Sequence, residues 1–320
     1  MQTVALIAAS LPGLAALGAL LFTWMQVGQA GKELRIFEHG QITSRFNAAV
    51  DNLGSQSMDV RLGGIYALER IMQDSSRDQP TIVSVLAAFA QRHAGSSTKS
   101  LKEPLAAGRD DLRPKADVQA AIATLARRRP ERDSGSIVDL TYTDLRGLRF
   151  TGKASINLPE ADLSESDLRW ATLSGANLRK ASLSYANLES AVLDGAYLRA
   201  ADLMGARLVG AGFTGANLRE ADMTCGGGIL SETGQEVEPA FCVNLQYAWL
   251  DDTDLRNAKM SNADLREANL AGADLRHADL TNADLTKADL TNADFRGAKL
   301  TGVKLQDAKR TGARGLPREG

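Results

Sequence analysis

The sequence predicts a mainly β fold, a coiled solenoid that follows a small α-helical region and an apolar N-terminal segment. Three observations predict this arrangement. A five-residue repeat runs through the second half of the chain, helix-like apolar patterns precede it, and no charged residue occurs before Lys32. A period of five fits neither the alternation of a strand nor the turn of an α-helix, which takes about 3.6 residues.

Leucine occupies nearly every fifth position of the repeat, and alanine lies two positions before it. Residues five apart on an extended chain point to opposite faces, so the chain must bend once per repeat to keep the leucines inside. Asp, Asn, Gly and Ser at the remaining positions favour such bends. The predicted core includes Leu163, Leu168, Leu173, Leu178, Leu265, Leu270, Leu275 and Leu280.

This motif, Ala-(Asp or Asn)-Leu-x-x, resembles that of the pentapeptide-repeat family; residues 273–277, Ala-Asp-Leu-Arg-His, are one instance. The resemblance implies a right-handed quadrilateral β-helix with four repeats per turn. About thirty repeats then imply about seven coils and a rod of about 35 Å. The segment at 60–71, behind an apolar segment and ahead of the repeats, resembles a group of bacterial membrane pentapeptide-repeat proteins with a helical N-terminal region.

The periodicity also predicts how the chain is divided. We expect helices at 42–53, 60–72, 80–92 and 114–129. The expected units are an anchor at 1–31, a helical domain at 32–93, a linker at 94–113, a capping helix at 114–135, repeats at 136–223 and 243–312, an inserted loop at 224–242 and a tail at 313–320.

The apolar segment predicts one transmembrane helix, because it is long enough to span a bilayer. The predicted anchor residues are Val4, Leu6, Leu14, Leu20, Phe22 and Trp24. A cleaved signal peptide, with Ala30 at the cleavage position, is the alternative, although a basic n-region is missing. Lys32 and Arg35 predict a single-pass membrane protein with its C-terminal domain in the cytoplasm. In that compartment Cys225 and Cys242 should remain thiols, and the sequence leaves open whether they pair.

Four repeats per turn would stack residues that are twenty apart. Arg256, Arg276 and Arg296 then form one column beside an Asp column, and Arg179, Arg199 and Arg219 form another. Such columns are either a self-neutralising solvated surface or a docking face. The inserted loop is either a tolerated insertion or a binding loop. The candidate partner-binding residues are Glu232, Glu236, Glu238, Arg256, Arg276 and Arg296.

Nothing in the sequence indicates catalysis. His39, His93 and His277 have no metal-ligand spacing, and no cofactor motif is present. A net charge of −2 makes a nucleic-acid partner unlikely. We therefore expect a non-enzymatic, membrane-tethered scaffold that presents a rigid rod to a protein partner at the cytoplasmic face. The alternatives are a DNA-mimic regulator of an enzyme such as gyrase, or a structural membrane homo-oligomer.

Overall fold

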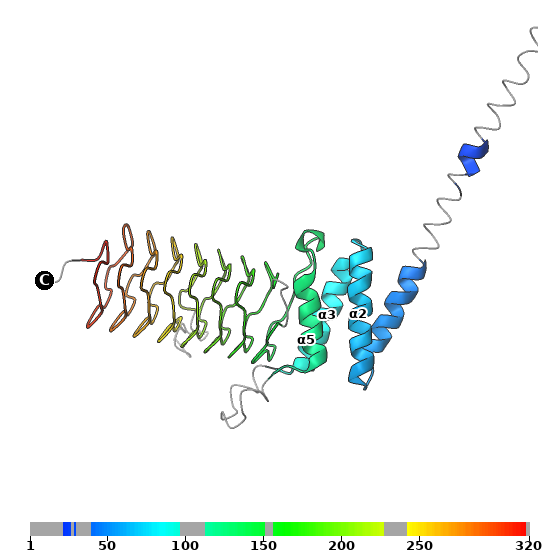
Figure 1. Cartoon of the computed structure of the whole chain (residues 1–320), viewed down its shortest axis with the longest axis horizontal. Coiled ribbons are helices and arrows are strands. Elements are labelled where there is room, and N and C mark those ends of the chain that lie inside the picture. Colours follow the sequence, from blue (N-terminus) through cyan, green and yellow to red (C-terminus); the bar gives the residue numbers. More distant parts are fainter. Residues whose placement is uncertain are drawn as a thin grey trace, which may run out of the picture.

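The computed structural model describes residues 22–26, 29, 40–96, 113–150, 156–226 and 242–317. The molecule is elongated: helices lie at one end, and a stack of coils extends from them to the C-terminal end (Figure 1). The helical unit contains a helix over 40–53, α2 (Met58–Asp74), α3 (Gln79–Ala94), α5 (Ala116–Arg127) and the 3-10 helix η2 (Pro130–Arg132). Each end of the four α-helices lies within two residues of its predicted position.

A close contact between two helices explains one of the two adjacent glycines in α2. A Cβ atom added to Gly64 would lie 2.7 Å from the carbonyl oxygen of Ala49, in the helix over 40–53. A Cβ atom on Gly63 would meet nothing within 4 Å. The helix therefore accepts the cost of glycine at position 64, about 1 kcal/mol relative to alanine, because only glycine lets the two backbones approach.

The repeats form a right-handed β-helix, as predicted. Its strands are reduced to isolated parallel bridges, one per repeat, between residues of successive coils such as Asp162 and Ser182. The alanine and leucine of each repeat point into one continuous core. The eight predicted core leucines lie in this core, and none is more than 3% exposed. Each fully buried leucine contributes about 1.5–3 kcal/mol of burial free energy.

The bridges define four flat faces, each with one outward residue per coil. Each face has eight such residues, so the rod has eight levels instead of about seven. Face 1 carries Asp139, Asp162, Ser182, Asp202, Asp222, Lys259, Asp279 and Lys299. Face 2 carries Asp144, Asp167, Asn187, Arg207, Asn244, Asp264, Asp284 and Lys304. Face 3 carries Arg149, Thr172, Val192, Gly212, Trp249, Asn269, Asp289 and Lys309. Face 4 carries Asn157, Asn177, Tyr197, Asn217, Asp254, Asp274, Asp294 and Arg314.

The helical unit covers the open edge of the first coil (Figure 1). At the end of α5, the carbonyl oxygen of Ala126 accepts a hydrogen bond from the backbone N–H of Asn157 at 3.1 Å. The buried guanidinium of Arg128 donates to the carbonyl oxygen of Asn157 and pairs with Asp133 at 2.8 Å. Burial lowers the pKa of Arg128, and Asp133 opposes that shift. These contacts pair backbone groups that would otherwise offer an edge for association.

The far end of the rod is closed by a cation. Arg310 occupies the position that leucine holds in other repeats, and its guanidinium donates to the carbonyl oxygen of Leu305 at 2.8 Å. Leu316, which follows it in the chain, packs against the core. A charged group inside the last coil opposes stacking of a second rod on this end.

The expected membrane topology is corrected by the structure. Phe22 and Trp24 are helical and exposed, whereas Val4, Leu6, Leu14 and Leu20 lie outside the described residues. Among the helices that the structure describes, none combines the length and the apolar character that a membrane crossing requires. The expectation of a single-pass membrane protein is therefore contradicted.

Candidate interaction surface

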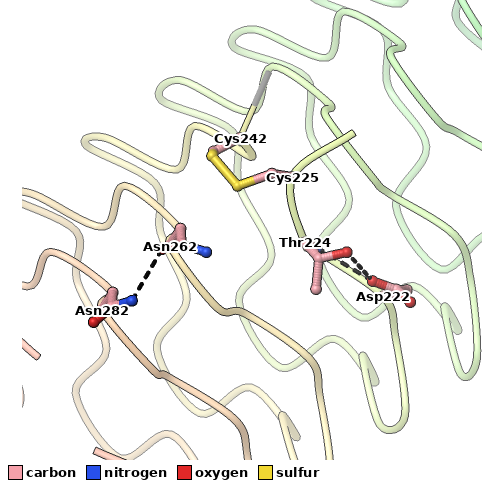
Figure 2. The surroundings of a disulfide bond; sticks show 6 residues. All are labelled: Asp222, Thr224, Cys225, Cys242, Asn262 and Asn282. Carbon is pink, nitrogen blue, oxygen red and sulfur yellow. Dashed lines mark hydrogen bonds between the residues drawn. A yellow bond between two sulfur atoms is a disulfide. The ribbon is translucent and has the colours of Figure 1, made fainter. Parts of the chain in front are cut away.

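The inserted segment leaves the rod at one corner, and a disulfide closes its base. Cys225 and Cys242 are bonded to each other, which contradicts the expectation of thiols (Figure 2). On either side of the bond the ladder continues: Gly205 donates to the carbonyl oxygen of Thr224 at 3.0 Å, and Leu208 donates to that of Asn244 at 2.7 Å. The insertion therefore adds 17 residues without shifting the coil, since Arg207 bridges Asn244 across 37 positions instead of 20.

Because the insertion preserves the register of the coils, the two predicted arginine columns form a single column. Backbone hydrogen bonds at the corner between faces 4 and 1 run from coil to coil, including one from Glu220 to the carbonyl oxygen of Arg256 at 3.0 Å. Six arginines therefore lie along a single edge, which we call the arginine edge: Arg179, Arg199, Arg219, Arg256, Arg276 and Arg296.

The arginine edge differs in its two halves. Arg256, Arg276 and Arg296 each form a two-pronged ion pair with the aspartate two residues before, at 2.6–2.7 Å. The hydrogen bonds from Arg296 lower the pKa of Asp294 to about 2. The corresponding face 4 residues beside the other three arginines are Asn177, Tyr197 and Asn217, which carry no charge. Glu220 pairs with Arg199 at 3.1 Å and Arg219 at 3.3 Å.

Aspartate columns near the C-terminal end are neutralised by the last coil. Lys299, Lys304 and Lys309 lie one coil above Asp279, Asp284 and Asp289 and pair with them at 2.8–3.3 Å. Stacked like charges repel at this spacing, and these lysines offset that repulsion. The hydroxyl of Thr281 and then Lys299 lower the pKa of Asp279 to about 2. Lys309 and then Thr291 do the same for Asp289.

Face 3 carries exposed aromatic and aliphatic side chains. From Thr172 to Asn269 its outward residues are uncharged over five successive coils. Trp249 is 58% exposed and Val192 is 37% exposed, with Gly212 between them in the same column. Tyr247, at the adjoining corner, is 54% exposed. We call Val192, Tyr247 and Trp249 the aromatic patch. Sequence reasoning missed it because Val192 is remote in sequence from Tyr247 and Trp249, and only the register across the insertion brings them to one face.

The loop residues Glu232, Glu236 and Glu238 lie outside the described residues, so their role stays a prediction. Among the described residues, no three His, Cys, Asp or Glu side chains are grouped as metal binding would require. His93 stacks on Phe89 at 4.1 Å between ring centroids and contacts its carbonyl oxygen. The side chain of His277 lies over Gly297 at the rod surface.

A square β-helix whose alanine and leucine side chains stack inside the coil is a repeat protein of the solenoid class. The model of the family described as "Pentapeptide repeats" matches residues 161–199, 186–224, 241–276 and 268–307 in 8 copies. The chain belongs to this family, as its sequence motif predicted. No curated protein matches the sequence.

Solved structures of the same family are similar to this chain. HetL from Nostoc sp. strain PCC 7120, a protein involved in heterocyst differentiation regulation, is 33% identical; the match covers 55% of this chain and 81% of HetL, with a TM-score of 0.26. A second pentapeptide repeat protein from Nostoc PCC 7120 is 46% identical over 22% of this chain and 59% of its own, with a TM-score of 0.22. QnrB1, a plasmid-mediated fluoroquinolone resistance protein, is 21% identical over 48% and 79%, with a TM-score of 0.37. At these TM-scores the likenesses carry no functional information.

Proposed function

We propose that the protein is a non-enzymatic interaction scaffold whose rod docks a protein partner on the aromatic patch of face 3. The observation that carries the proposal is Trp249, which is more than half exposed on a rigid face whose outward residues carry no charge from Thr172 to Asn269. Tryptophan and tyrosine are enriched at the centres of protein interfaces, because they bury large areas at low entropic cost.

The remaining faces support this choice by contrast. Many of their charged side chains form pairs within the rod, such as Arg266 with Asp264 at 2.7 Å and Lys259 with Asp222 at 2.7 Å. A group already paired gains little from a partner, because the partner must compete with the existing ion pair. From Thr172 to Asn269 the outward residues of face 3 are uncharged, so a partner that binds there competes with no ion pair of these residues.

Affinity capture with matched variants tests the proposal. Wild-type protein, Trp249→Ala and Tyr66→Ala are immobilised and exposed to the same native extract, after circular dichroism shows that all three are folded. Tyr66 is a suitable control because it is 54% exposed on α2 and does not belong to the aromatic patch. A partner retained by wild type and Tyr66→Ala but lost by Trp249→Ala supports the patch. Identical partner sets for all three proteins would refute it.

The same capture experiment tests the other predicted partner-binding residues. A deletion of residues 226–242 removes the loop glutamates, and single Arg→Ala variants test Arg256, Arg276 and Arg296. A DNA mimic is our second candidate, on the family resemblance of the motif alone. We rank it lower because the aspartates at the C-terminal end of the rod are neutralised by lysine and arginine. Failure to inhibit gyrase supercoiling would remove that candidate.

A further inference from the structure

We propose that the helical unit binds a phosphate group in a small cavity lined by four arginines, Arg127, Arg128, Arg129 and Arg132. The cavity lies where the end of α2, the first residue of α3 and the segment after α5 meet (Figure 1). Its volume is about 50 Å³. One water molecule needs about 10–15 Å³ of such space, so the cavity has room for a small polyatomic anion. This inference does not depend on the aromatic patch, which belongs to the rod.

Two of the four arginines are already neutralised within the chain. Arg127 pairs with Glu69 at 2.7 Å, and Arg128 pairs with Asp133 at 2.8 Å. Glu69 also lines the cavity, so its carboxylate enters the same balance of charge. These two pairs therefore add no net charge to the cavity.

The other two arginines have no counter-ion. Arg129 is exposed and Arg132 is half-buried, and no carboxylate in the described part of the chain forms an ion pair with either of them. Glu131, which lies between them in the sequence, is exposed and does not line the cavity. The cavity therefore carries a surplus of two positive charges. Burial of an unpaired charge is unfavourable, and a bound anion would remove that cost.

The end of the neighbouring helix does not account for these two side chains. Arginines near a helix C-terminus often donate to its last carbonyl groups. In α5 this role belongs to Arg128, which donates to the carbonyl oxygen of Leu125 at 3.0 Å. Across the described ranges, no carbonyl oxygen accepts a hydrogen bond from the side chain of Arg129 or Arg132. Both guanidinium groups are therefore available to a ligand.

The backbone that carries the two arginines is held in place. The buried side chain of Gln79 donates from Nε2 to the carbonyl oxygen of Arg129 and to the carboxylate of Asp133, both at 2.6 Å. The backbone N–H of Arg132 donates to the same Arg129 carbonyl oxygen at 2.9 Å. This turn, which includes η2, is thus fixed before any ligand arrives, and a fixed site loses less entropy on binding.

A phosphate group suits this arrangement better than other anions. Each guanidinium can donate two parallel N–H bonds to the oxygens of a phosphate. Gln73, which is exposed and lines the cavity, offers a further amide donor. A phosphate monoester carries about −1.5 to −2 charges at pH 7, which matches the surplus of two, whereas chloride or a carboxylate supplies one. The group can belong to free phosphate or to the end of a larger molecule, and the chemistry of recognition is the same.

Isothermal titration calorimetry on the full chain tests this site. The probes are inorganic phosphate and O-phosphoserine, each titrated at an ionic strength held constant with chloride. We expect wild type to bind with a dissociation constant of about 1 mM or below. Arg129→Gln and Arg132→Gln should each weaken binding about tenfold, because each removes hydrogen bonds to a charged group. The double variant should show no binding up to about 20 mM, a limit well above that constant.

A matched variant separates this site from general attraction of anions. Arg92→Gln removes one exposed arginine of α3 that does not line the cavity, so it should bind as wild type does. The variants at 129 and 132 should unfold in urea as wild type does, since their side chains have no partner to lose in the described structure. Binding of O-phosphoserine would assign the cavity to a phosphate group on a larger molecule, and binding of phosphate alone would assign it to the free ion. The inference is overturned if wild type binds neither probe, or if the double variant binds as tightly as Arg92→Gln.

Discussion

Removal of the disulfide should show how much closing the inserted segment contributes to the free energy of unfolding of the protein. Replacing Cys225 and Cys242 by serine opens a loop whose ends are 17 positions apart. The chain-entropy relation for a loop of this length gives a loss of about 3 kcal/mol in the free energy of unfolding. The structure supplies the matched comparison: deleting residues 226–242, with Cys225→Ser, joins two repeats in register, because the 17 inserted residues add nothing to the coil.

Urea unfolding followed by far-UV circular dichroism measures these differences. We expect the double serine variant to unfold about 3 kcal/mol more easily than the oxidised wild type, and reductant to produce the same loss in wild type. The deletion variant should recover to within about 1 kcal/mol of wild type, since it has no loop to close. A deletion variant no more stable than the double serine variant would refute the reasoning, because the segment would then contribute packing that the rod needs.

The remaining predictions concern the helical unit and the C-terminal coils. Gly64→Ala should destabilise the protein because its Cβ would clash with a backbone oxygen, whereas Gly63→Ala, in open space, should stabilise α2 by up to about 1 kcal/mol; equal thermal midpoints would contradict this. Arg128→Ala should cost about 3–5 kcal/mol in urea unfolding, because it leaves a buried carboxylate unpaired, and a loss below about 1 kcal/mol would count against it. The lowered pKa values of Asp279 and Asp289, about 2 against 3.8, stabilise the fold above pH 3.8. That stability should disappear as the pH falls from 3.8 towards 2, by up to about 1 kcal/mol per pair, and unfolding that does not depend on pH in this window would exclude it.

The sequence was sufficient for the elements whose physics is local or periodic. The five-residue repeat predicted that the leucines lie inside a coil, and the apolar stripes predicted the ends of the helices to within two residues. It was not sufficient across the insertion. Met223 and Leu245 are 22 positions apart, which is not a multiple of five, so the sequence alone could not tell how many of those residues belong to the coil. Only the bridge between Arg207 and Asn244 fixes that number and joins the six arginines into one edge.

The wrong predictions share one cause. The expected cytoplasmic thiols followed from the expected membrane anchor, so both depended on one reading of an apolar segment. Contacts that depend on tertiary packing could not be predicted either. The ion pair between Arg128 and Asp133, the contact of Gly64 with Ala49 and the closure of the last coil by Arg310 depend on tertiary packing that no local pattern records.

The neutral register of the inserted segment has a consequence for how such a protein changes over evolutionary time. The segment between Cys225 and Cys242 can change in length or composition while the disulfide keeps its two ends together. The backbone hydrogen bonds from Gly205 to Thr224 and from Leu208 to Asn244 then stay in place. Sequence changes within the inserted segment are thereby separated from the constraints that keep the rod folded.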